Sequence, residues 1–476
     1  MAALTRWLEL LWDRPARIVS ASFVTVALVG TALLMIPAAT TAPGALRFLD
    51  ALFTATSAVC VTGLIVVDTA TAFTTFGQGV ILLLIQIGGL GIMAFTVSTV
   101  YLVRRRLTMD EAELLSFMLN ERNRHVVARQ LRDVILLTFA IEAVGAVVLT
   151  AAFVARGTGA GTAFWYGVFH AVSAFCNAGF ALFSDSLEQF VSAPVINVSV
   201  MLLIVAGGIG FGTLILFRRD PVPQVADAAD EPLTYQPRIV SGGRMAGVGR
   251  RLGMPQALAA RVAVTGTVVL IILGAVLYYL LEARHALLGM SLPRKYLAAL
   301  FQSVTLRTAG FDTVAFSDVR RATLLVTLPF MFIGGASGGT AGGIKIGSAA
   351  VLVAEVRRFL LRQRDAVVFH RRLAGRLITQ AVVLSMAGVA AVFVATTMLS
   401  ITETAPLETI VFEVVSALGT VGLSTGLTGT LSDTGRVVVV LLMFVGRLGP
   451  LTLFAALRPE GKTANVRVPE GELPVG

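Results

Sequence analysis

Charged residues are scarce in this chain: Asp, Glu, Lys and Arg make up 14% of its 476 residues, whereas hydrophobic residues make up 56%. Soluble domains contain about 25% charged residues. The composition therefore excludes an ordinary soluble domain and predicts a protein with several membrane spans. The formal net charge of +10 would also suit a nucleic-acid-binding protein, but the positions of the basic residues argue against that class, and we expect no nucleic-acid partner.

Cysteine and histidine are also scarce, with two and four residues. Two cysteines are too few for a disulfide framework, and the sequence has no Cys/His cluster that predicts a metal site. An enzyme buried in the membrane would need a nucleophile with its base, or a set of metal ligands, within the spans. Four histidines give little material for that, so we expect no enzyme, no catalytic residue and no resident cofactor or metal.

Long apolar stretches dominate what is present. Eight of them have about 20 residues or more, the length needed to cross a hydrocarbon core of about 30 Å, so we predict an all-α membrane protein. The stretches are residues 17–37, 76–103, 131–154, 195–217, 262–281, 324–360, 377–399 and 437–457, and glycines interrupt the sixth.

A short motif occurs four times, once between the two spans of each successive pair. It consists of an aromatic residue, a run of small and polar residues, and a glycine followed by a large apolar residue. A serine follows the aromatic by four residues in three copies (Ser57, Ser173 and Ser416), and the third copy is one residue shorter. A helix of about 12 residues covers only about 18 Å, so each copy can enter the membrane and turn back. The copies are residues 53–64, 169–180, 301–311 and 412–423.

The basic residues show on which side the loops lie. If the four motifs do not cross, the termini and the three long loops between pairs share one side, and 27 of the 38 Lys and Arg lie there. Eight lie on the other side, and Arg307, Lys345 and Arg447 fall within the membrane region. By the positive-inside rule the basic side is cytoplasmic. We therefore predict four re-entrant segments and cytoplasmic N- and C-termini.

The repeating unit is a span, a re-entrant half-helix, a glycine segment and a second span. Four such units in one orientation predict a pseudo-fourfold arrangement around one central pore. A polar, proline-containing insertion separates the second unit from the third. The expected boundaries are 1–103 for repeat 1, 104–217 for repeat 2, 218–258 for a cytoplasmic linker, 259–360 for repeat 3, 361–458 for repeat 4 and 459–476 for a cytoplasmic tail.

The glycine segments suit an ion-selectivity filter. Irregular backbone at membrane depth is tolerated only where protein covers it or where it lines water. Four such segments around one axis would place backbone carbonyls in rings that replace the water shell of a cation. No carboxylate ring occurs at a shared position, since Ile65, Ala181, Asp312 and Ser424 follow the four glycines by two residues. The predicted filter residues are Val61, Thr62, Gly63, Asn177, Ala178, Gly179, Thr308, Ala309, Gly310, Thr420, Val421 and Gly422.

Several residues of the motif flank this filter. We expect Cys60 and Cys176, at equivalent positions, to pack beside it, and Arg307, at the same level in the third copy, to brace it from behind. Each copy has a polar residue directly after the aromatic. These residues either hold the half-helix in its protein surroundings, which we favour, or tune the pore vestibule. They are Thr54, His170, Gln302 and Glu413.

The second span of the third unit contains six glycines in ten residues. Each destabilises a helix by about 1 kcal/mol relative to alanine, so the span should break into two halves joined by a loop. A phosphate-binding loop is disfavoured because no Gly-Lys-Ser/Thr ending is present. A structural hinge is an alternative, but we favour an intramembrane gate below the filter. The predicted gate residues are Gly334, Gly335, Ala336, Ser337, Gly338, Gly339, Thr340, Ala341, Gly342, Gly343 and Arg447.

Arg447 belongs to the gate because it lies in the corresponding span of the fourth unit. A charge at the centre of a span costs at least about 2.5 kcal/mol, so its side chain should face the pore or a partner. As a pore-facing cation it would oppose the passage of cations beside the loop. The alternative is that the side chain extends toward the cytoplasmic surface.

The chain resembles a known family. The four span–motif–span units, with residues 61–64, 177–180, 307–311 and 420–423, look like the Trk/Ktr/HKT superfamily of cation transporters. The segments 340–345 and 446–450 strengthen the likeness. The chain is most similar to the KtrB family, the membrane subunits of bacterial Ktr potassium uptake systems.

The resemblance implies K⁺ as the main transported ion, with Na⁺ open as a second one, in a multi-pass protein of the bacterial plasma membrane. Glycine in all four filter copies is the family pattern associated with preference for K⁺. The resemblance also assigns gating to loop 334–343 and Arg447. Implied partners are membrane lipid, a second copy of the chain in a homodimer, and a cytoplasmic KtrA-like regulatory ring that binds adenine nucleotide.

Two other classes remain as alternatives. A secondary transporter with broken helices would have inverted repeats and an acidic coupling site near the membrane midplane. This chain has repeats of one orientation and no convergent acid pair. An intramembrane enzyme lacks the residues named above.

Overall fold

The computed structural model describes residues 15–42, 44, 46–102, 124–215 and 254–449. Most of these residues are helical, as the composition predicts. The expected tail 459–476 and most of the expected linker, residues 218–253, lie outside the described residues. The described strands, β1 (Val367–Val368) and β2 (Arg371–Arg372), form one antiparallel hairpin between α15 and α16.

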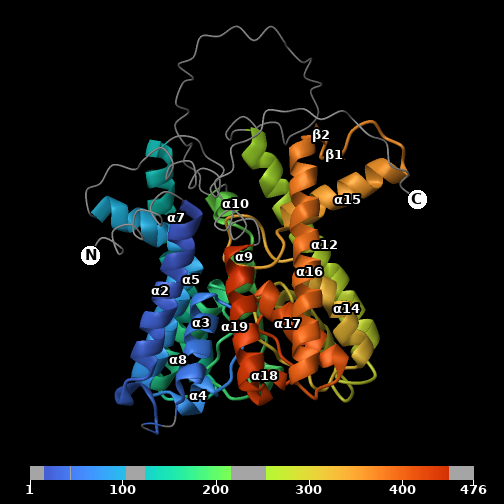
Figure 1. The fold of residues 1–476 in the computed structure, drawn as a ribbon. Helices are drawn as coiled ribbons and strands as arrows, with labels where there is room; N and C mark the ends of the chain where they lie inside the picture. Colours follow the sequence, from blue (N-terminus) through green and yellow to red (C-terminus); the bar gives the residue numbers. More distant parts are fainter. Residues whose placement is uncertain (1–14, 43, 45, 103–123, 216–253, 450–476) are drawn as a thin grey trace.

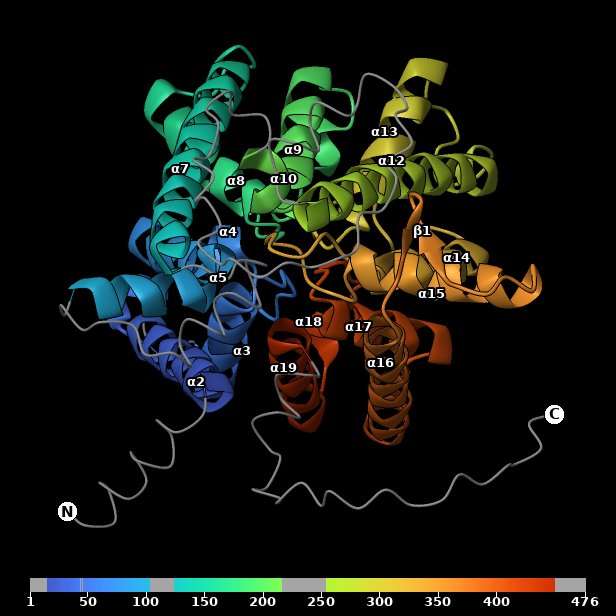
Figure 2. The same ribbon diagram turned by 90° about the horizontal axis from the view of Figure 1, so that it is seen from above.

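The principal helices form four groups of three, and Figure 2 shows these groups arranged around a common centre. In each group two helices stand on either side of a third, which is the predicted half-helix (Figure 1). The groups are α2 (Pro15–Leu34), α3 (Phe48–Val59) and α5 (Thr75–Leu102); α7 (Arg124–Val154), α8 (Ala160–Phe175) and α9 (Pro194–Gly208); α12 (Met254–Glu282), α13 (Leu292–Thr305) and α14 (Arg321–Phe332); and α16 (Gly375–Thr402), α17 (Leu407–Gly419) and α19 (Asp433–Leu448).

Short elements complete the described chain. Three of them (α4, η2 and α18) connect the half-helix of a group to the helix that follows it, η1 precedes α3, α10 follows α9, and α15 continues the third group beyond α14. These elements are η1 (Pro37–Ala39), α4 (Thr69–Ala72), η2 (Glu188–Phe190), α10 (Phe211–Ile215), α15 (Ile346–Leu360) and α18 (Leu427–Thr430).

The groups contact one another in a cyclic pattern. The last helix of each group packs on the half-helix of the next, as α5 on α8, α9 on α13, α14 on α17 and α19 on α3. Two ion pairs support the last of these contacts, Arg436–Asp50 at 2.5 Å and Arg47–Asp433 at 2.6 Å. Repeated contacts of one kind that close on themselves fit same-orientation repeats, and they do not fit the inverted repeats of many secondary transporters.

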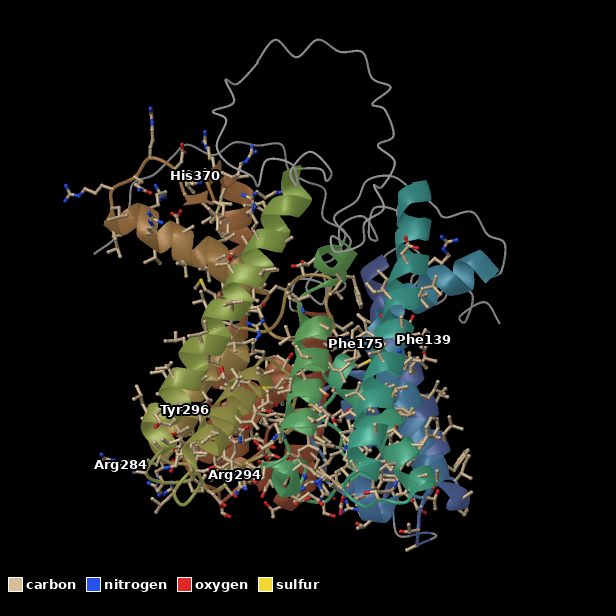
Figure 3. The ribbon with its side chains drawn as sticks, turned by 180° about the vertical axis from the view of Figure 1, so that it is seen from behind. Phe139, Phe175, Arg284, Arg294, Tyr296 and His370 are labelled. Atoms are coloured by element: carbon tan, nitrogen blue, oxygen red, sulfur yellow. The ribbon has the colours of Figure 1, made fainter. Side chains whose placement is uncertain are left out.

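The apolar side chains lie both in the core and on the outer surface. Phe175 is fully buried among the helices, whereas Phe139 on α7 is half exposed at the outside of the bundle (Figure 3). The outer faces of α12 and α16 are also apolar, with Leu280 and Phe393 largely exposed. An apolar surface of this extent suits contact with lipid tails rather than with water.

Within the described residues, three helices are long and apolar enough to cross a membrane, compared with eight stretches expected from the sequence. They are Arg132–Val154, Leu258–Glu282 and Gly375–Thr402, the first long helices of the second, third and fourth groups. The helices that follow the half-helices are interrupted or end early. Gly91 (φ 76°) breaks α5, Gly210 (φ 88°) follows the end of α9, and Gly449 (φ 77°) follows the end of α19. Because glycine readily adopts positive φ, these positions stop the helix where apolar sequence continues.

Candidate functional site

The four motif glycines meet at the centre of the bundle. A Cβ built on Gly422 would lie 2.1 Å from the carbonyl oxygen of Thr62, and one on Gly63 would lie 2.4 Å from that of Ala178. No real side chain tolerates such distances, so each glycine allows the neighbouring segment to approach. The closest contacts run from Gly63 to Ala178 and Gly179, from Gly179 to Gly310, from Gly310 to Gly422, and from Gly422 to Thr62 and Gly63. The twelve predicted filter residues therefore come from four segments that form a closed ring.

Each segment has the same unusual backbone. The residue two before the glycine has a positive φ in every copy: 54° at Val61, 59° at Asn177, 67° at Thr308 and 47° at Thr420. Three of these residues are β-branched, for which positive φ is a true outlier. Such conformations cost on the order of 1–3 kcal/mol each and cluster at functional sites. Strain repeated at one register in four segments makes this ring the candidate functional centre.

Backbone hydrogen bonds explain how each segment leaves its half-helix. In the first copy Thr62 N donates to Ser57 O at 2.8 Å, five residues back, and the second and fourth copies repeat this bond. In the third copy Ala309 N donates to Thr305 O at 3.0 Å, only four residues back. The third copy is one residue shorter, and this tighter turn accommodates the difference without displacing Gly310 from the ring.

A hydroxyl group behind each segment holds it in place. Ser57 Oγ accepts a hydrogen bond from Gly63 N at 3.1 Å, and Ser416 Oγ accepts one from Gly422 N at 3.1 Å. In the other two copies the hydroxyl donates instead: Ser173 Oγ to Phe180 O at 2.8 Å, and Thr305 Oγ1 to Phe311 O. The sequence showed the shared serine but gave it no role. Its fixed distance from the glycine was the available signal.

The polar residue after each aromatic is buried and bonded within the protein. His170 accepts from Leu182 N at 3.3 Å, Gln302 donates to Val314 O at 2.5 Å, and Glu413 accepts from Ser424 Oγ at 3.0 Å. These bonds join three half-helices to the chain that leaves the ring. Thr54 bonds only to its own helix, through Asp50 O at 2.8 Å. Three of the four side chains thus hold their half-helices in the surrounding protein, which is the role favoured from the sequence.

The glycine-rich span breaks as predicted. Helix α14 ends at Phe332 and α15 begins at Ile346. The two ends of the connecting loop are held together, because Gly334 N donates to Ile344 O and Ile344 N donates to Phe332 O, both at 2.9 Å. Residues 334–343 therefore form a closed loop projecting from two adjacent strands of chain.

This loop is bonded to the end of α9 and to the ring. Ala336 N donates to Gly208 O at 2.9 Å, and Thr340 N donates to Gly207 O at 3.1 Å. Gly342 N donates to the hydroxyl of Thr308, a predicted filter residue, at 3.1 Å. The predicted filter and the predicted gate are thus brought into direct contact.

Two cations hold adjacent carbonyls of the loop. Arg447 donates through Nη1 to Thr340 O at 2.5 Å and through Nη2 to Gly88 O of α5. Lys345 Nζ donates to Ala341 O at 2.6 Å. Arg447 is thus directed at the loop, and its guanidinium joins the loop to the first group.

We predict that Arg447→Ala raises cation flux through the purified protein in liposomes by about three- to fivefold, the factor that corresponds to one lost hydrogen bond of about 1 kcal/mol. The increase stays limited because the bonds of the loop to α9 and to Thr308 remain. Arg284→Ala is the matched control, since Arg284 is an exposed arginine outside the loop and the ring. An Arg447→Ala protein that conducts like the control would remove Arg447 from the gate.

Acidic side chains lie where the third segment leaves the ring. Asp312 follows Gly310 by two residues, its backbone N donates to Ser186 Oγ at 3.2 Å, and Leu187 N donates to its carbonyl at 3.0 Å. Burial and the nearby carboxylate of Glu188 raise the pKa of Asp312 to about 7. Burial, with Asp185 and Asp318, also raises the pKa of Glu188. Asp312 and its neighbouring carboxylates therefore lie together beside the chain that leaves Gly310.

The chain is similar to known cation transport proteins. The family model described as "TrkH: Cation transport protein" matches residues 5–218 and 257–465. The chain is 36% identical over 470 residues to "Ktr system potassium uptake protein B" of Bacillus subtilis, covering 98% of each chain. It is 33% identical over 469 residues to "Potassium/sodium uptake protein NtpJ" of Enterococcus hirae, covering 97% of each.

A solved structure shares the fold. The crystal structure of the potassium transporter TrkH from Vibrio parahaemolyticus superposes with a TM-score of 0.66 at 19% identity, covering 92% of this chain and 85% of that one. At this identity the likeness concerns the fold alone. It agrees with a helical membrane transporter.

Proposed function

This chain belongs to the TrkH family of cation transport proteins, and on that premise we propose that it is the membrane subunit of a Ktr-type potassium uptake system. It conducts K⁺ across the plasma membrane through a gated, channel-like pore. The family consists of transporters, so the chain is not an enzyme. The pore is the axis of the glycine ring, and the twelve filter residues select the ion through their carbonyl oxygens.

The observation that carries this proposal is the mutual contact of Gly63, Gly179, Gly310 and Gly422. Where four segments approach this closely without side chains, backbone oxygens are the groups available to replace the hydration shell of K⁺. The strained residue two positions before each glycine holds the segment away from ordinary helix. The two relatives named above are described as potassium and potassium/sodium uptake proteins, which supports K⁺ and keeps Na⁺ as a second ion.

Loop 334–343 and Arg447 form the gate. The loop lies against Thr308 at one entrance of the ring, and a loop in that position obstructs an ion leaving or entering the filter. Glycine-rich backbone can move at low cost because it lacks side chains to repack. Arg447 stabilises the closed loop and adds a positive charge that cations must pass.

The chain is oriented with both termini in the cytoplasm. The basic hairpin region around His370 lies at one end of the bundle, and Arg284 and Arg294 lie at the opposite end (Figure 3). Seven arginines between 357 and 376 support a cytoplasmic position for the His370 end. The four repeats have the boundaries 1–103, 104–217, 259–360 and 361–458, separated by the linker 218–258. A second copy forms the homodimer, and a KtrA-like ring with bound adenine nucleotide docks at the cytoplasmic face.

In this orientation Asp312 lies at the extracellular mouth, and we predict that K⁺ uptake at low ionic strength increases as external pH rises from 6 to 8. A carboxyl with a pKa of about 7 is neutral below that pH and negative above it, and negative charge at a pore mouth concentrates cations. Asp312→Asn should show the low-pH rate throughout. A variant that keeps the full pH dependence would exclude Asp312 as its source.

Ion flux into liposomes containing the purified chain tests the function. We expect K⁺ and Rb⁺ to enter faster than Na⁺, without any requirement for a proton gradient. Uptake that depends on an imposed proton gradient would instead support a coupled secondary transporter. Equal entry of K⁺ and Na⁺ would contradict the assignment of the ring as a potassium filter.

A further inference from the structure

We propose that Arg307 is a positioning residue that couples the closed position of loop 334–343 to the cation preference of the filter. This inference rests on the proposed function, since it concerns the same ring and the same loop. It adds that the filter and the loop are not independent. When the loop moves away from its closed position, the conformation of the ring changes.

Arg307 is held by the loop in an otherwise apolar setting. Arg307 is only 5% exposed, and its Nη2 donates to Gly334 O at 3.3 Å. Within the described residues Nη1 has no hydrogen-bond partner and no carboxylate lies within ion-pair distance. A buried guanidinium with a single acceptor is costly to keep. The free energy of burying this guanidinium therefore depends strongly on whether the loop is in the position that brings Gly334 O to it.

The neighbouring residue is held by the other end of the same loop. Thr308 accepts a hydrogen bond from Gly342 N at 3.1 Å through its hydroxyl. Thr308 is the strained filter residue of the third copy, with φ 67°. Both side chains of this dipeptide thus bind the loop, one near its start and one near its end. Movement of the loop removes both contacts at once.

The third copy also differs from the others in the turn by which it leaves its half-helix. It is one residue shorter, and it leaves its half-helix through the four-residue bond from Ala309 N to Thr305 O rather than the five-residue bond of the other three copies. At the position of Arg307 the other copies carry Cys60, Cys176 and Gly419, which lack a charged group. The segment with the different turn is the one that the loop holds through side chains.

The loop touches two further segments. Thr340 Oγ1 donates to Phe175 O, the last carbonyl of α8, at 3.1 Å. A Cβ built on Gly342 would lie 1.8 Å from Thr420 Oγ1, so the loop packs directly on the fourth copy. Coupling between two sites is reciprocal. If the closed loop changes the affinity of the filter for an ion, then an ion in the filter changes the stability of the closed loop by the same factor. Cation preference and gating therefore share one equilibrium.

The test compares the K⁺/Na⁺ permeability ratio of four proteins in liposomes: the unaltered chain, Arg307→Gln, the deletion of residues 334–343, and the combination. We expect Arg307→Gln to lower the ratio by about fivefold or more, the lower end of measured couplings. The deletion should lower it similarly, and the combination should add nothing to the deletion. Arg307→Lys, which keeps a donor and the charge, should retain most of the preference.

Two variants keep the test decisive. Cys176→Ala lies at the equivalent level of the second copy and contacts Gln86 and Glu142 rather than the loop, so its ratio should stay unchanged. Thr340→Val removes the bond from the loop to the end of α8 without touching Arg307, and it should also lower the ratio.

The linkage would be overturned if Arg307→Gln left the K⁺/Na⁺ permeability ratio unchanged. It would also be overturned if Arg307→Gln changed that ratio equally in the unaltered chain and in the protein that lacks residues 334–343. An unaltered chain with no preference for K⁺ would instead overturn the proposed function itself.

Discussion

Deletion of residues 334–343 is expected to raise K⁺ flux through the purified protein by about tenfold or more. The closed loop is held by several hydrogen bonds, each worth about 1 kcal/mol net, so it obstructs the ring in most molecules. Flux follows the fraction of molecules in which the path is open. Removing the loop opens the path in all of them. The measurement is ⁸⁶Rb⁺ or K⁺ uptake into liposomes at equal protein density.

The local geometry makes this deletion feasible. Ile333 and Ile344 already form a parallel bridge, with Ile344 N bonded to Phe332 O at 2.9 Å. Joining them therefore requires little movement of α14 or α15. Arg284→Ala again serves as the control. Loss of flux in a deletion protein that still purifies as a folded species would contradict the gate.

Substitution of Gly63 by serine is expected to lower the preference for K⁺ over Na⁺ by about tenfold, the factor that corresponds to 1.4 kcal/mol. Gly63 has φ 94°, and a Cβ there would lie 2.4 Å from Ala178 O and 3.1 Å from Gly179 Cα. The first and second segments must move apart to admit it. A carbonyl ring with altered spacing fits a dehydrated K⁺ less well.

A matched glycine separates this effect from general damage. Gly79 lies on α5, and nothing lies within 4 Å of a Cβ built there. Gly79→Ser should therefore leave both flux and preference unchanged. The ratio of K⁺ to Na⁺ permeability, from reversal potentials or competing uptake, is the quantity to compare. A Gly63→Ser protein with the preference of the Gly79→Ser protein would count against the filter.

The sequence predicted the elements that repetition makes visible. The four motifs, their half-helices and the break between Phe332 and Ile346 follow from spacing and from six glycines in one span. The spans were predicted less well, because hydrophobicity does not report the φ angle of a glycine. Gly91, Gly210 and Gly449 thus stop helices within apolar sequence that reads as continuous.

Contacts between distant parts of the chain were beyond the sequence. It indicated that Arg447 should have a partner, but not that Thr340 and Gly88 are those partners. It placed Arg307 behind the filter, but the bond to Gly334 joins residues from two different motifs. Such pairs depend on how the helices pack, and no periodicity in the sequence encodes them.

The most direct test of the central claim is to locate bound ions. A structure of the protein determined in Rb⁺ or Tl⁺, with element-specific scattering or difference density, should show ions on the axis enclosed by Gly63, Gly179, Gly310 and Gly422. Replacement of K⁺ by Na⁺ should weaken that density. Strong ion density elsewhere in the bundle, with none inside the glycine ring, would contradict the assignment of the four segments as the filter.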